Sequence, residues 1–133
     1  MYKIAYLDKD IELVAIDEVI DLITTLVKRD IYPSPYFLSI TLPNKNIIYF
    51  GIGSTPNHIV VFFKPYSILE DDKISRDTSQ SYENSPVIKF LNPHSTHSFE
   101  CNEYNLLLFD SVIPHLHSLL IDGDMSCIPC YSY

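Results

Sequence analysis

Two hydrophobic periods follow one another in the first part of the chain. Every second residue is nonpolar over residues 2–6 and again over residues 11–15, on either side of a charged stretch at 8–10. This alternation predicts two half-buried strands joined as a hairpin. From residue 16 to 27 the apolar residues recur at steps of three and four, which predicts an amphipathic helix. Pro33 and Pro35 follow it and are expected to prevent the helix from continuing.

The middle of the chain predicts three further strands. Residues 36–42, 46–52 and 58–64 are rich in aromatic and β-branched side chains, and turn-forming residues separate them at 43–45 and 53–57. We expect an antiparallel meander. The run from His58 to Phe63 is almost continuously apolar, which indicates a central strand that is covered on both faces.

The composition changes over residues 70–85, where three consecutive acids precede a series of small polar residues. We interpret this stretch as a polar, acidic insertion that forms a long loop or mobile segment. A structureless stretch of this length inside a compact domain is usually either functional or disordered, and both alternatives remain open. Residues 87–91 then resume the character of a strand, and residues 99–101 predict a short edge strand.

A second helix is predicted between Asn102, a suitable N-cap, and Gly123, a suitable stop. Pro114 should kink or break it near residues 110–111. The segment 125–133 is expected to return as a final strand. The apolar face of this helix is predicted to contain Leu106, Phe109, Ile113, Leu116 and Leu120, and the first helix is expected to pack through Ile20, Ile23 and Val27.

These elements predict an α+β fold in which two amphipathic helices pack on an antiparallel sheet of about five to seven strands. The length of 133 residues suits a single domain, which we place over residues 1–133. Nearly half of the residues are apolar, with ten tyrosines and seven phenylalanines, so the chain has enough material for one core.

Charge limits the classes of partner. The chain has 17 acidic and 9 basic residues and a formal net charge of −8. Direct binding of DNA or RNA is disfavoured, because such binding relies on neutralising phosphates with Lys and Arg. An acidic surface instead attracts a basic protein and speeds the encounter, while solubility alone is an equally simple explanation.

Compartment and membrane association follow from the same sequence. Charge appears too early in the chain for a signal peptide, and the longest apolar runs, at 59–63 and 106–109, are far shorter than the roughly 20 residues of a membrane-spanning helix. Three cysteines do not make a disulfide framework. We therefore expect a soluble, cytoplasmic protein with reduced thiols.

The candidate chemical motifs favour binding over catalysis. Cys127 and Cys130 have the spacing of a redox pair but follow the last helix, where no helix N-terminus would lower a thiol pKa. A zinc site would need further ligands, and the candidates lack a second close pair. These candidates are Cys101, His94, His97, His115 and His117. We expect no cofactor, no metal and no enzymatic activity.

The order of elements resembles the first-numbered family of bacterial immunity proteins from polymorphic toxin systems, which often accompany deaminase toxins. The likeness rests on a strand that starts Pro-Tyr-Phe-Leu at residue 35, the Gly51-Ile52-Gly53 turn, and an amphipathic helix that ends at Gly123 before an aromatic tail. The family often has a tryptophan in this tail, where the present chain has Tyr131 and Tyr133.

The resemblance implies an immunity protein that binds a cognate toxin domain in the cytosol and occludes its active site or substrate groove. A regulatory or structural subunit and a small-ligand-binding module are the alternatives. We expect the partner to bind the acidic insertion. One alternative is that the insertion is a solvated loop with no partner. The other is that the partner binds the 51–57 turn. The acidic residues proposed for partner binding are Glu70, Asp71, Asp72, Asp77 and Glu83.

Overall fold

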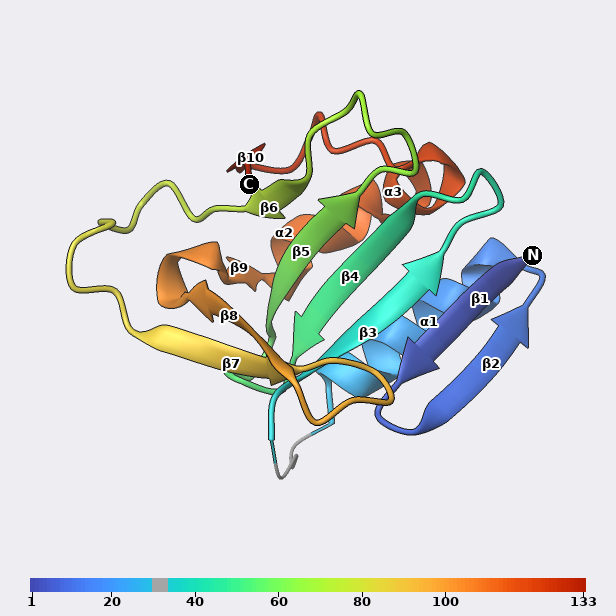
Figure 1. Cartoon of the computed structure of the whole chain (residues 1–133), viewed down its shortest axis with the longest axis horizontal. Helices are drawn as coiled ribbons and strands as arrows, with labels where there is room; N and C mark the ends of the chain where they lie inside the picture. Colours follow the sequence, from blue (N-terminus) through green and yellow to red (C-terminus); the bar gives the residue numbers. More distant parts are fainter. Residues whose placement is uncertain (30–33) are drawn as a thin grey trace.

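The computed structural model of the chain describes residues 1–29 and 34–133 and shows an α+β fold built on one open, mostly antiparallel sheet (Figure 1). The main path of the sheet runs β2–β1–β3–β4–β5–β6–β10. The predicted fold class is confirmed, although the described residues form ten strands, more than the five to seven expected. The strands of this path are β1 (Tyr2–Tyr6), β2 (Lys9–Leu13), β3 (Tyr36–Thr41), β4 (Ile47–Ile52), β5 (His58–Lys64), β6 (Lys73–Ser75) and β10 (Cys130–Ser132).

The first hairpin and the meander are both confirmed. Strands β1 and β2 pair antiparallel with Ile4 opposite Ile11, and β3, β4 and β5 pair in sequence order. Strand β5 lies between β4 and β6, and its five residues from Ile59 to Phe63 are all buried. Its side chains alternate between two separate apolar clusters, so the prediction of a central strand covered on both faces is also confirmed.

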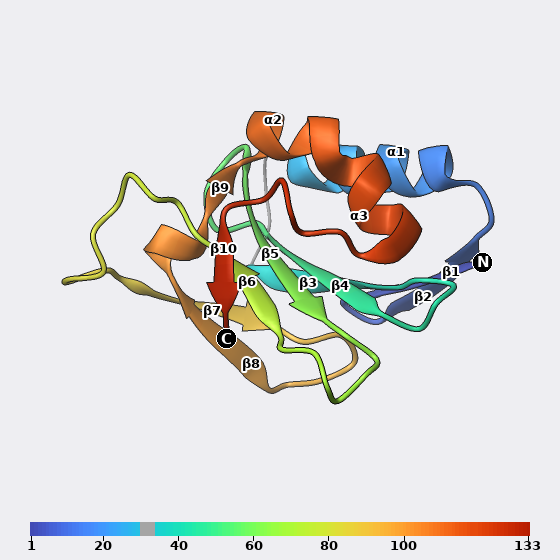
Figure 2. The ribbon, with the colours of Figure 1, turned by 90° about the horizontal axis from the view of Figure 1, so that it is seen from above.

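Helices cover one face of this sheet, and a hairpin lies against part of the other (Figure 2). The helices are α1 (Ile16–Val27), α2 (Phe109–Val112) and α3 (Leu116–Asp122). The hairpin consists of β7 (Val87–Leu91) and β8 (Ser98–Asn102), and it joins the sheet through one parallel pair, Tyr36 with Leu91. Among the described residues β8 pairs only with β7, which confirms the predicted edge strand.

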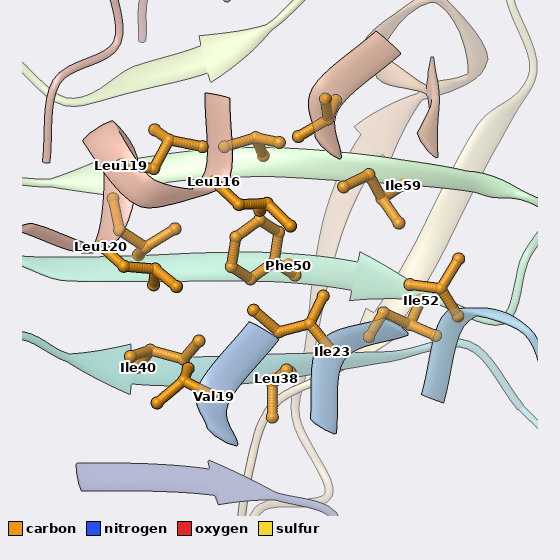
Figure 3. Close-up of a cluster of buried hydrophobic side chains, with 14 of the residues drawn as sticks. Val19, Ile23, Leu38, Ile40, Phe50, Ile52, Ile59, Leu116, Leu119 and Leu120 are labelled. Atoms are coloured by element: carbon orange, nitrogen blue, oxygen red, sulfur yellow. The ribbon is translucent and has the colours of Figure 1, made fainter. Parts of the chain in front are cut away.

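Aliphatic side chains fill the space between the helices and the sheet (Figure 3). Helix α1 contributes Val19 and Ile23, and the spacing of these residues places them on one helical face. The residues shown against them from the sheet and from α3 are Leu38, Ile40, Phe50, Ile52, Ile59, Leu116, Leu119 and Leu120. This cluster confirms the predicted packing of both helical regions on the sheet.

The predicted helix 102–123 is wrong in its first third. Asn102 caps only a single 3₁₀ turn, Glu103–Asn105, and the short strand β9 (Leu107–Leu108) then pairs with β5. The helix starts at Phe109, and Pro114 interrupts it with a second 3₁₀ turn at Ile113–His115, slightly later than predicted. The buried residues that flank this turn are Val112 and Leu116.

The observed burial corrects the predicted apolar face of the second helix. Ile113 is 40% exposed, whereas Val112 and Leu119 are completely buried. Leu106 is buried, but in the cluster on the other side of the sheet. The predicted stop is confirmed: Gly123 has a left-handed φ of 78°, and its N–H donates a hydrogen bond to the carbonyl of Leu119.

The first helix ends as its pattern predicted, at Val27, with Lys28 as its C-cap. Pro33, one of the two residues expected to stop it, lies outside the described residues. Within the described ranges, no helix combines the length and the apolarity that crossing a bilayer requires.

The polar insertion 70–85 is not structureless throughout. Strand β6 runs through it, and both Ile74 and Ser75 are completely buried. The Ser75 hydroxyl accepts a hydrogen bond from the backbone N–H of Val61 and donates one to the carbonyl of Asn105. A polar residue in this position satisfies buried backbone groups, which explains why a short strand forms in a stretch with so few apolar side chains.

Candidate functional site

The face of the sheet away from the helices is open where the β7–β8 hairpin ends. Residues paired across neighbouring strands share a face, so the registers define two rows of side chains on it. The residues between these two rows, such as Ile4, Ile40 and Ile48, point to the opposite face and belong to the helix-side core. One row contains Glu12, Lys3, Thr41, Ile47 and Lys64, and the other contains Asp10, Ala5, Ser39, Tyr49 and Phe62. The face therefore changes from polar at β1 and β2 to aromatic at β4 and β5.

A groove of about 220 Å³ opens at the aromatic end of this face. We call it the aromatic groove. Its floor consists of the buried rings of Phe37 and Phe62, and the partly exposed ring of Tyr49 forms part of its wall. The full lining is Phe37, Tyr49, Phe62, Lys64, Asp72, Asn92, Phe99 and Tyr133.

The rings of Phe62, Phe99 and Tyr133 in the groove contact one another at steep angles. The ring of Tyr133 stands at 85° to that of Phe62, with 5.4 Å between the centroids. The ring of Phe99 lies 5.3 Å from that of Phe62 and 5.5 Å from that of Tyr133. Such edge-to-face contacts are favourable, and they hold the three rings in a fixed arrangement.

Two distant parts of the chain supply the walls of the groove. The backbone N–H of Tyr133 donates a hydrogen bond of 2.8 Å to the carbonyl of Asp72, which fixes the segment after β10 beside β6. On the other side, Phe90 of β7 stacks on Phe37 with 5.3 Å between the ring centroids. Gly51 permits this approach, because a Cβ there would meet the Phe90 ring at 3.0 Å and the Phe37 ring at 3.1 Å. The Gly51-Ile52-Gly53 segment thus has a packing role.

The far end of the β7–β8 hairpin is tied to the first hairpin. The backbone N–H of His94 donates a hydrogen bond of 2.8 Å to the carbonyl of Leu7, and Nε2 of His94 lies 2.9 Å from Oδ1 of Asp10. These contacts keep the hairpin, and with it Phe99, in place over the sheet.

The loop between β5 and β6, residues 65–72, borders the groove, and we call it the β5–β6 loop. Lys64 and Asp72, at its two ends, both line the groove. At its tip Ile68 is 98% exposed and Leu69 is 91% exposed. The base of the loop is anchored, because the N–H of Tyr66 donates a hydrogen bond of 2.9 Å to Oδ1 of Asn46.

Three of the five acids predicted to bind a partner, Glu70, Asp71 and Asp72, lie on this loop directly after the exposed apolar tip. They do not all face the same hollow. Asp72 lines the aromatic groove, whereas Glu70 lines a different hollow together with Asp122 and Asp124. The chain therefore places negative charge on both sides of the loop.

The other two predicted acids lie apart from the loop along the chain. The carboxylate of Asp77 accepts hydrogen bonds from the N–H and the hydroxyl of Ser79, which lower the pKa of Asp77. It is thus part of a local turn. Glu83 is exposed, and its N–H donates to the hydroxyl of Ser81.

Arg76 organises the segment around these turns. Its guanidinium carbon lies 3.7 Å from the ring centroid of Tyr82 and 5.1 Å from that of Tyr104. Its two terminal nitrogens donate hydrogen bonds to the carbonyls of Asp77 and Gln80. An arginine packed against two tyrosine rings and bonded to two carbonyls thereby links residues of a stretch that its composition predicted to be a loop.

The cysteines and histidines show no arrangement that carries chemistry. Burial raises the pKa of the Cys101 thiol to about 12 and also raises that of Cys130, the opposite of what a nucleophile needs. In the described part of the chain, no three His, Cys, Asp or Glu side chains gather as metal ligands would. The alternative surface at the 51–57 turn is held to α2 by a hydrogen bond from the Phe109 N–H to the Asn57 carbonyl.

Sequence reasoning missed both the exposed tip and the aromatic groove. Tyr66, Ile68 and Leu69 directly precede the three acids, so an apolar run without strand alternation was a usable signal. The groove left no such signal, because its five rings come from five separate segments. Comparison with known protein families finds no model that matches the chain, and no curated protein matches it either.

Proposed function

We propose that this protein is an immunity protein that binds a basic toxin domain and occludes its active site or substrate groove. One observation carries the proposal. The β5–β6 loop holds Ile68 and Leu69 almost fully in solvent, immediately beside Glu70 and Asp71, on a chain of net charge −8. Folding does not explain this exposure, because neither apolar side chain is packed.

The two parts of the loop suit the two requirements of a protein interface. Apolar side chains that become buried on binding supply affinity, at about 25 cal/mol for each Å² removed from water. The acids around them act mainly on the association rate and on the discrimination against wrong partners. A partner that fits this loop has an apolar pocket with basic residues at its rim.

A toxin that acts on nucleic acids fits this description, because its substrate-binding surface has to be basic. An acidic protein on that surface competes with the phosphate backbone. The resemblance to the immunity family supports the same partner class, and the proposal places the complex in the cytoplasm and assigns no catalytic activity to this chain.

The proposal predicts that a gene next to this one encodes a toxin domain, and the test uses that domain. Co-expression of the two proteins in a toxin-sensitive bacterium should restore growth, and the purified proteins should form a stoichiometric complex. The double substitution Ile68→Ser with Leu69→Ser should raise the Kd of that complex at least about tenfold, as for the loss of a central apolar anchor. Biolayer interferometry would measure it.

Ile121→Ser is the matched control, because Ile121 is 61% exposed on α3, on the opposite side of the sheet. It should leave the Kd unchanged. The substitutions Glu70→Gln and Asp71→Asn together should slow association at low salt and have little effect at high salt. No rescue of growth and no complex would contradict the immunity proposal, and a stoichiometric complex with a non-toxin protein would favour the regulatory-subunit alternative.

A further inference from the structure

We infer that the aromatic groove is a binding site for an arginine side chain presented by the basic partner. The inference rests on the proposed function only for the identity of the molecule that carries the arginine. The site itself belongs to this chain and can be tested without any partner.

The shape of the groove suits a flat cation. Phe37 and Phe62 form the floor, and the rings of Tyr49, Phe99 and Tyr133 rise around it as partly exposed walls. The volume of about 220 Å³ leaves room for a side chain but not for a folded element. A guanidinium stacks favourably on aromatic faces, and perpendicular rings offer it a face and an edge to pack between.

Charge at the rim favours a cation with hydrogen-bond donors. Asp72 lines the groove, and its carboxylate can accept the paired N–H donors of a guanidinium. Burial, and to a lesser degree the negative charge of Asp72, raises the pKa of the Tyr49 hydroxyl, so this carboxylate acts on the aromatic wall. An apolar ligand would gain nothing from Asp72.

The chain already binds one arginine in this way. Arg76 lies over the ring of Tyr82 and close to that of Tyr104, and carbonyl oxygens accept its N–H donors. The aromatic groove repeats the two components of that arrangement, ring faces and an oxygen acceptor, but leaves the position of the cation open to solvent.

Lys64 also lines the groove, and its positive charge opposes a second cation. The inference can therefore be tested with both residues, because Asp72 and Lys64 should have opposite effects on the affinity for a cation. Removing Asp72 should weaken the binding of a cation, whereas removing Lys64 should strengthen it. A groove that takes any apolar group would respond to neither change.

The experiment is an NMR titration of the isolated, isotope-labelled protein with N-acetyl-argininamide at low salt. Saturable shifts should appear at groove residues, with a Kd on the order of millimolar for so small a ligand. Asp72→Asn should raise the Kd roughly fivefold, as for the loss of one partly exposed charged contact. Lys64→Gln should lower it about twofold.

Three controls decide the chemistry. Asp21→Asn removes an exposed acid on α1, on the other side of the sheet, and it should leave the Kd unchanged. Tyr133→Leu keeps an apolar wall but removes the ring face, and it should weaken binding. N-acetyl-leucinamide should not bind at the groove, and N-acetyl-lysinamide should bind more weakly than the arginine compound, since its ammonium cannot stack.

The absence of saturable groove shifts with N-acetyl-argininamide would overturn the inference. Equal affinity for the leucine compound, or an unchanged Kd in Asp72→Asn, would overturn it as well. These outcomes are independent of the immunity proposal. If the groove binds arginine but the protein binds no toxin, only the proposed function is refuted. If the protein binds a toxin but the groove does not bind arginine, only this inference is refuted.

Discussion

The two sides of the sheet are built from different side chains. The side under the helices is mainly aliphatic, with a minority of aromatic rings such as Phe50 and Phe109, and residues such as Val19, Ile23 and Leu119 have no exposed area. The other side is aromatic, and several of its rings, including Tyr49, Phe99 and Tyr133, remain partly in solvent. Aliphatic side chains gain stability only through burial, whereas an aromatic ring can be fixed by its neighbours and still present a face.

This difference indicates a division of work within one domain. The helix side holds the fold together, and the helix-free side combines a rigid floor with an open surface and an acidic loop. Substitutions should therefore separate into those that unfold the protein and those that leave it folded but alter what it binds.

The largest effect is expected on the helix side. Phe109→Ala removes a completely buried ring from the start of α2 and should lower the free energy of unfolding by about 3–5 kcal/mol. Ile113→Ala, four residues on and 40% exposed, should cost about 1 kcal/mol or less. Urea unfolding curves of the two variants would measure the contrast, and equal losses would show that the buried face of this helix is misplaced.

A large effect on thiol reactivity is expected at Cys101, which is buried on the aromatic side of the sheet. Because the pKa of Cys101 is raised to about 12, its thiolate at pH 8 should be roughly a thousandfold scarcer than that of an ordinary cysteine. Its labelling rate should rise with pH up to that value. Cys127 is exposed and should react first with a thiol reagent at pH 8. Mass spectrometry after timed labelling would show the order, and early modification of Cys101 in the folded protein would contradict it.

A smaller loss is expected at the polar contact that fixes β6. Asn105 is buried; its Oδ1 accepts from the N–H of Asn102, and its Nδ2 donates to the carbonyl of Ser75. Asn105→Ala should lower the free energy of unfolding by about 1–3 kcal/mol, because it leaves buried partners unpaired. Asn105→Asp keeps the acceptor but loses the donor and buries a negative charge, so at neutral pH it should cost at least as much as Asn105→Ala, and thermal unfolding would measure both variants. A midpoint unchanged in both would exclude this role.

Much of the fold follows from local periodicity, and the exceptions have physical causes. The hairpin, α1 and the meander were predictable because each carries its own hydrophobic period. Strand β6 was not, since a buried hydroxyl at Ser75 and a partner at Asn105 replace the apolar pattern there. The start of the second helix was misplaced because Leu107 and Leu108, which suit a helix, pair instead with β5.

The candidate site was predictable only where one segment carries it. The acids at 70–72 form a contiguous run, and the structure places them on one exposed loop. The aromatic groove depends on the register of the sheet and on the hydrogen bond from Tyr133 to Asp72. No local sequence pattern predicts either of these. Asp77 resembled its acidic neighbours in sequence, but Ser79 holds it in a turn.

Hydrogen exchange of the protein with and without the proposed toxin partner tests the central claim most directly. The account predicts that binding slows exchange in the β5–β6 loop, in β6 and around Tyr133, while α2 and α3 on the opposite side exchange at unchanged rates. Protection confined to the helices, with the loop still exchanging freely in the complex, would contradict the assignment of the helix-free side as the binding surface.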